Sequence, residues 1–164
     1  MLFWQLQIIP LVLCFATINS FAQTHKLPNK IRQDLTRQIG NWQLVSFTQP
    51  DGKKCCQVIT GDFDGNRQSD YAVYVMAEKG SQATRQRLIL YLKKGPHYYR
   101  RTLSRQTANT EIMPFFFKKG TKDYRYDTHK YFHYKYDTVG LFSEKAGESY
   151  LYRKGRFYPV ITSD

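Results

Sequence analysis

The stretch that decides the fold is residues 61–76, which reads GDFDGNRQSDYAVYVM. Its second half, residues 71–76, is apolar on both faces, which is typical of a strand in the middle of a sheet. Its first half is rich in Gly, Asp and Asn, which favour tight turns. The sequence therefore predicts a polar loop that leads directly into a central β-strand.

More strands are predicted on both sides of this segment, because short runs there are rich in β-branched and aromatic residues. The predicted single strands are residues 42–47, 56–60, 112–117, 131–136 and 139–142. Two hairpins are also predicted, in which residues 87–93 turn into residues 97–103 and residues 150–153 turn into residues 157–161. The turns at Gly95 and Gly155 allow these reversals. Residues 105–110 are expected to form a loop.

Residues 27–39 predict the one helix of the chain. Ile31, Leu35 and Ile39 recur at every fourth residue and so lie on one face, while Gly40 supplies a stop signal. The predicted fold class is α+β, mostly β, with this N-terminal helix packed on an antiparallel sheet built from hairpins.

The first 22 residues are typical of a signal peptide. They contain no Lys, Arg, Asp or Glu, and Ser20 and Ala22 fit cleavage before Gln23. A signal anchor is the competing interpretation, but Gln7 and Pro10 leave fewer than the roughly 18 continuous apolar residues that span a bilayer. The sequence predicts a periplasmic or secreted protein with a signal peptide at 1–22, one mostly β domain at 23–164 and no membrane span after cleavage.

The predicted exported chain is strongly basic. All 25 Lys and Arg and all 13 Asp and Glu lie beyond residue 22, so the formal net charge stays +12. This charge favours an anionic polymer or another protein as partner, and export argues against nucleic acid. Cleavage leaves two adjacent cysteines, Cys55 and Cys56, which cannot form a disulfide that links distant parts of the chain. One of them is expected to face the core.

The polar loop carries oxygen atoms at a spacing that suits a hard cation. The candidate metal ligands are Asp62, Asp64, Asn66, Gln68 through its backbone carbonyl, and Asp70. Calcium takes about six to eight such oxygens. The spacing is not that of an EF-hand, because Arg67 stands where that loop needs Gly and Val73 where it needs Glu. In the alternative interpretation the Asp and Asn side chains cap backbone N–H groups without a metal.

Asp62, Asp64, Asn66 and Asp70, together with the apolar run that follows them, resemble the calcium loops of FG-GAP and VCBS repeats. The resemblance covers residues 61–75 only. It implies a structural calcium ion in a loop that joins neighbouring strands. Arg67 departs from the family, which often has Gly at this position.

Aromatic and basic residues are interleaved in residues 122–136. Within the predicted strand, alternation places Tyr131, His133 and Lys135 on the exposed face and turns Phe132, Tyr134 and Tyr136 toward the core. The other interpretation of this stretch is a stacking platform for sugars or single-stranded nucleic acid.

These patterns favour an exported, non-enzymatic binding module with a structural calcium loop and an anionic partner. Two alternatives remain open. One is a hydrolase of an envelope polymer, which needs Asp62 or Asp70 beside another titratable group in a pocket. The other is an inhibitor or immunity-type protein, which a flat aromatic patch in residues 124–136 would favour.

Overall fold

The computed structural model describes residues 27–45, 47–48, 54–55, 58–77, 85–107, 112–143 and 146–163. The predicted signal peptide and Cys56 lie outside these residues, so the predictions about them stay predictions. The described part of the chain is mostly β, with antiparallel sheets and one short helix, α1 (Asn29–Ile39). It contains no helix that is long and apolar enough to cross a membrane.

The first large sheet has five strands, β1 (Trp42–Leu44), β4 (Val58–Gly61), β5 (Asp70–Ala77), β6 (Arg85–Lys94) and β7 (His97–Thr107). Their order is β1-β5-β6-β7, and β4 also pairs with β5. Val73 of β5 has partners on both sides, Val58 of β4 and Ile89 of β6. The prediction of a central strand is confirmed, as is the hairpin β6–β7, in which Gly95 has a φ of 60°.

The second large sheet has the order β13-β12-β11-β8. Its strands are β8 (Met113–Phe117), β11 (Thr138–Phe142), β12 (Gly147–Arg153) and β13 (Arg156–Ser163). The predicted hairpin β12–β13 is confirmed, and its turn residues Lys154 and Gly155 both have positive φ. Two small sheets pair β2 (Phe47–Thr48) with β3 (Lys54–Cys55) and β9 (Lys122–Arg125) with β10 (Lys130–His133).

Several predicted boundaries differ from the observed ones. The predicted strand 42–47 ends at Leu44, and Phe47 belongs to β2, which pairs with β3 instead of β5. The predicted strand 131–136 ends at His133, because the pairing with β9 breaks at Tyr134. Its N–H still bonds to the carbonyl of Thr121, but its own carbonyl accepts from the N–H of Gly120 instead of Thr121. Residues 105–107 of the expected loop at 105–110 belong to β7, since Thr107 still pairs with Arg85, and residues 108–110 lie outside the described residues. Strand β9 was not predicted, because its residues are mostly charged.

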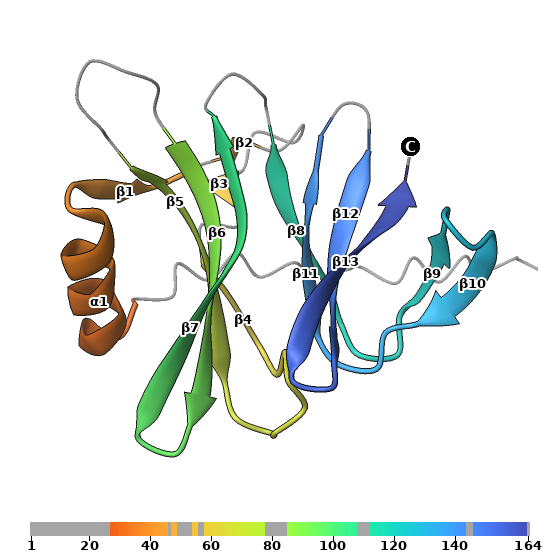
Figure 1. Ribbon diagram of the computed structural model, residues 1–164, viewed down its shortest axis with the longest axis horizontal. Helices are drawn as coiled ribbons and strands as arrows, with labels where there is room; N and C mark the ends of the chain where they lie inside the picture. The colour runs from red at the N-terminus through yellow and green to blue at the C-terminus, as the bar shows by residue number, and fades with distance from the viewer. Residues whose placement is uncertain are drawn as a thin grey trace, which may run out of the picture.

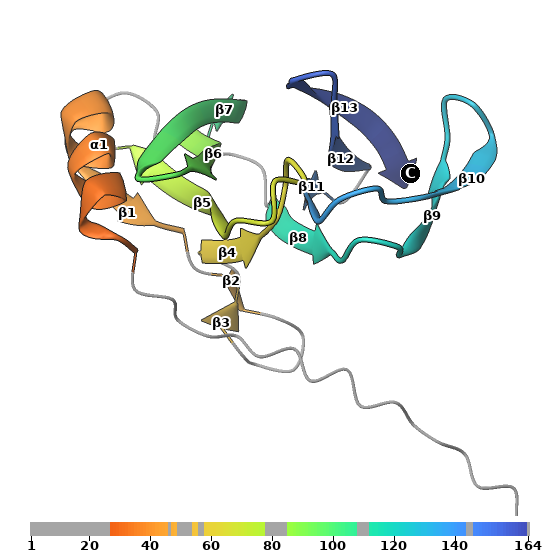
Figure 2. The ribbon, with the colours of Figure 1, turned by 90° about the horizontal axis from the view of Figure 1, so that it is seen from below.

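The two large sheets lie side by side, with α1 at one end of the molecule and β9–β10 at the other (Figures 1 and 2). One cluster of buried side chains joins the sheets, and it includes Tyr74, Leu90, Leu141 and Tyr150. Phe63, from the loop between β4 and β5, is buried in the same cluster. The polar loop is therefore anchored where the two sheets meet.

A second cluster lies on the other face of the first sheet. It contains Leu27, Ile31, Leu35, Val73, Val75, Ile89 and Tyr91. The Tyr91 hydroxyl donates a hydrogen bond of 3.0 Å to Asp34. Strands β5 and β6 thus bury side chains on both faces, since Leu88, Leu90 and Leu92 belong to the first cluster.

Candidate metal centre

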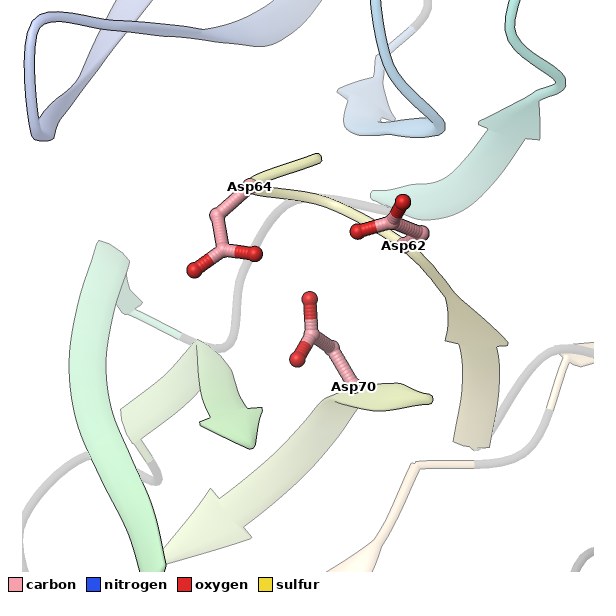
Figure 3. A group of neighbouring side chains, drawn as sticks. All are labelled: Asp62, Asp64 and Asp70. Carbon is pink, nitrogen blue, oxygen red and sulfur yellow. The ribbon is translucent and has the colours of Figure 1, made fainter. Parts of the chain in front are cut away.

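Three carboxylates of the polar loop converge (Figure 3). Asp62 and Asp64 lie in the loop after β4, and Asp70 is the first residue of β5. One ligand oxygen from each lies within 4.8 Å of the others. Like charges at this separation repel one another unless a cation or a proton neutralises them.

Asp70 is fully buried and is fixed by two backbone donors. Its two oxygens accept hydrogen bonds from the N–H of Phe63 at 2.9 Å and of Lys93 at 2.7 Å. Burial raises the pKa of Asp70 to about 7, although the two backbone donors lower the pKa. The neighbouring charges of Asp64 and Asp62 raise it further. A cation at this point favours the ionised carboxylate that burial disfavours.

One oxygen of Asp62 has no hydrogen-bond partner among the described residues. Its Oδ2 accepts a hydrogen bond of 3.1 Å from the N–H of Arg67. Its Oδ1 is buried and has no hydrogen-bond partner among the described residues. A buried oxygen of this kind costs free energy unless a proton donor or a cation meets it. The loop thus shows the capping hydrogen bonds of a polar turn and also leaves an acceptor for an ion.

The two amide side chains of the candidate set tie the loop to the β6–β7 hairpin. Asn66 donates from Nδ2 to the carbonyl of Lys93 at 2.7 Å, and its Oδ1 accepts from the N–H of Gln68 at 2.8 Å. Gln68 accepts at Oε1 from the N–H of Gly95 at 3.1 Å. The structure therefore brings together Asp62, Asp64 and Asp70, and it gives the side chains of Asn66 and Gln68 a positioning role.

Sequence reasoning missed Asp137 as a support of the loop. Its Oδ2 accepts a hydrogen bond of 3.1 Å from the N–H of Asp62, and its Oδ1 accepts one of 3.0 Å from the N–H of Lys119. Next to it, Tyr136 lies so close to Gly65 that a Cβ atom on that glycine would be 2.0 Å from the ring. Asp137 is 75 residues from Asp62 in the sequence. No local pattern could have linked the two.

No family model, curated protein or solved structure matches this chain. The resemblance to FG-GAP and VCBS loops therefore rests on residues 61–75. The candidate ligand atoms of Asp62, Asp64 and Asp70 are all carboxylate oxygens. Carboxylate oxygens suit hard cations such as calcium and magnesium rather than the softer transition metals.

If calcium binds this loop, its affinity should depend on pH, because Asp70 must lose its proton to bind an ion. The folded-state pKa of about 7 lies above the ordinary value of 3.8. In the metal-free protein, stability therefore falls as the pH rises from about 4 to about 7. The unfolded chain loses the Asp70 proton near pH 4, whereas the folded protein keeps it until about pH 7. Calcium affinity should fall about tenfold per pH unit below about 7 and level off above it. Calorimetric titrations at several pH values between 5.5 and 8 measure this.

Buffers of different ionisation enthalpy provide the control. Near pH 6, binding should release close to one proton, and at pH 8 almost none. Equal affinity at pH 5.5 and pH 8 would contradict a role for Asp70 in binding the ion.

Proposed function

We propose that this protein is an exported, non-enzymatic binding module, one mostly β domain over residues 23–164, with a calcium ion in its 61–70 loop. The convergence of three carboxylates within 4.8 Å is the observation that carries the proposal. Asp62 Oδ1, buried without a hydrogen-bond partner among the described residues, supports it. The ion would neutralise charges that otherwise repel where β4, β5 and β6 meet, so its role is structural.

We also propose that α1 forms a layer packed on the first sheet. Ile31 and Leu35 are fully buried in one cluster with Val75 of β5 and Ile89 of β6. The hydrogen bond from Tyr91 to Asp34 supports the same arrangement. The helix buries its apolar face in this way, as its period-four pattern requires.

A structural ion is favoured over the envelope-polymer hydrolase. The hydrolase requires Asp62 or Asp70 to face a pocket with a second titratable group. Neither of two surface pockets in the described part of the chain, the larger about 650 Å³, is lined by these residues. Both oxygens of Asp70 instead accept hydrogen bonds from backbone N–H groups.

The inhibitor or immunity-type alternative has one observation in its favour. Tyr124 contacts Tyr126 and Tyr131, with ring centroids 5.0 and 5.1 Å apart. Tyr131 is 68% exposed. Exposed aromatic side chains are enriched where proteins dock on one another. This function would be supported if the wild-type protein bound a protein partner and the variant Tyr131→Ala did not.

Calcium titration tests the proposed function. Calcium added to chelator-treated protein should bind at one saturable site. At a concentration of a hundred times Kd it should stabilise the fold by about 2.7 kcal/mol. For a chain of this size the melting temperature should then rise by roughly 5 to 10 °C. Calorimetry gives the binding curve, and thermal melts with calcium or with chelator give the shift.

Magnesium serves as the comparison ion, because a flexible site with several carboxylates favours the larger calcium ion. No heat of binding at millimolar calcium, together with identical melting curves in calcium and in chelator, would contradict the proposal. The loop would then be a metal-free polar turn.

A further inference from the structure

A pocket of about 470 Å³ lies between the segment after β10 and the end of β12. Among the described residues that line it are Tyr134, Lys135, Tyr136, Tyr152, Arg153 and Lys154. Its volume falls within the range of about 300 to 1,000 Å³ that is usual for small-ligand sites. It is distinct from the metal centre but adjoins it through Tyr136.

The pocket is strongly positive. Lys135, Arg153 and Lys154 line it, and no Asp or Glu is among its described lining residues. Arg153 also lies directly opposite Arg156 in the β12–β13 ladder. Like charges in directly opposed positions destabilise a sheet, and an anion held near them relieves the repulsion.

Aromatic rings lie beside these cations. Tyr136 and Tyr152 have centroids 6.0 Å apart and line the pocket together. The Lys135 ammonium group lies 5.3 Å from the centre of the Tyr136 ring. A flat apolar ring next to a cation suits a ligand that has a ring face and an acidic group on the same unit.

Hydrogen bonds anchor one wall of the pocket at Tyr134. The Tyr134 hydroxyl is hydrogen-bonded to the Ser149 hydroxyl at 2.8 Å and also to Asp123. Tyr134 is 2% exposed, and Ser149 is fully buried. Burial and the bond to Asp123 raise the pKa of Tyr134, so the phenol stays protonated and keeps its donor. The residues on either side of Tyr134 are thereby held in place for a ligand.

The pocket is joined to the metal centre at one end. Tyr136 packs against Gly65, and Asp137 accepts a hydrogen bond from the N–H of Asp62. An ion that fixes the loop also fixes the backbone that carries Tyr136. Affinity in the pocket should therefore depend on the metal, because a pre-ordered site loses less entropy on binding.

We propose that this pocket binds an acidic sugar unit of an anionic polysaccharide, with calcium in the 61–70 loop strengthening the binding. The inference rests on the proposed function, since it identifies the site and the class of its anionic partner. The Lys and Arg side chains of the pocket contact the acidic group, and the tyrosine rings pack on the face of the sugar. A recess of this size takes one or two rings, whereas single-stranded nucleic acid needs a groove that follows several nucleotides.

Binding of a hyaluronan tetrasaccharide to the full-length mature protein tests the proposal, measured by calorimetry with calcium present. Lys135→Ala and Arg153→Ala should each weaken binding about tenfold, the loss of one charge-assisted contact. Maltotetraose, a neutral sugar of the same length, should bind at least tenfold more weakly. Chelator should weaken hyaluronan binding severalfold.

Arg37→Gln is the matched control, because it removes one positive charge from α1, at the far end of the molecule (Figure 1). An equal loss of affinity with Arg37→Gln would overturn the proposal in favour of unspecific attraction. Tighter binding of deca-thymidylate with the same dependence on Arg153 would overturn it in favour of nucleic acid. Calcium titrations of Lys135→Ala and Arg153→Ala should match the wild type, so failure of the pocket and failure of the metal loop can be told apart.

Discussion

Asp62→Ala and Asp64→Ala are each expected to lower calcium affinity by roughly a hundredfold or more. Each removes one of three carboxylates whose oxygens lie within 4.8 Å of one another. The remaining ligands keep too little negative charge to offset the dehydration of the ion. The rise in melting temperature with calcium should disappear in both variants, and titration calorimetry with paired thermal melts measures both effects.

Asp127→Ala is the control for the loss of one carboxylate. Asp127 is exposed and pairs with Arg125 at 2.7 Å, away from the loop. An exposed ion pair contributes only about 0 to 1 kcal/mol, so calcium affinity should stay within twofold of the wild type. If calcium still binds to Asp62→Ala and Asp64→Ala with unchanged affinity, the ion lies elsewhere in the chain.

Gly140→Ala is expected to destabilise the protein by about 3 kcal/mol or more and to lower its melting temperature by roughly 10 °C. Gly140 is buried in β11, between β8 and β12. A Cβ atom there would lie 2.2 Å from Cζ of Phe115 and 2.4 Å from the carbonyl oxygen of Glu148. The carbonyl belongs to a neighbouring strand and can move only if the ladder shifts. Chemical denaturation and thermal melts measure the loss.

Gly120→Ala is the matched glycine control. Gly120 has a φ of 86° and no heavy atom within 4 Å of a Cβ placed on it. Its substitution should cost only about 1 kcal/mol, the strain of the backbone conformation. Full recovery of Gly140→Ala by the added change Phe115→Ala would show that the ring, and not the Glu148 carbonyl, limits the space.

The sequence predicts best where one local pattern determines the element. The apolar run at β5 and the turns at Gly95 and Gly155 gave a central strand and two hairpins, because these features depend on a few adjacent residues. Strand ends were predicted less well. Tyr134 still alternates as expected, but its carbonyl accepts from the N–H of Gly120 instead of its in-register partner Thr121, so β10 ends before it. Tertiary hydrogen bonding thus determined that boundary.

In the candidate site, too, the local sequence predicts one part and tertiary contacts determine the other. The spacing of Asp62, Asp64 and Asp70 predicted a cluster, and the structure brings them within reach of one ion. The predicted exposure of Tyr131, His133 and Lys135 and the burial of Tyr134 are also confirmed, whereas Phe132 and Tyr136, which were predicted to face the core, are only half-buried. The sequence could not indicate the support from Asp137, because the partner of that contact lies in the other half of the chain.

The hydrogen bond between Asp62 and Asp137 joins residues 75 positions apart in the chain. Contacts of this separation form slowly, since a long segment must first lose its freedom. The pairings within hairpin β6–β7 are local, so this hairpin can form early. The hydrogen bonds around Asp62 are complete only when Asp137, directly before β11, lies beside the loop. An ion that binds only after the loop has formed its hydrogen bond to Asp137 would bind late in folding. It would therefore slow unfolding more than it speeds folding. Calcium would then act mainly on how long each molecule stays folded.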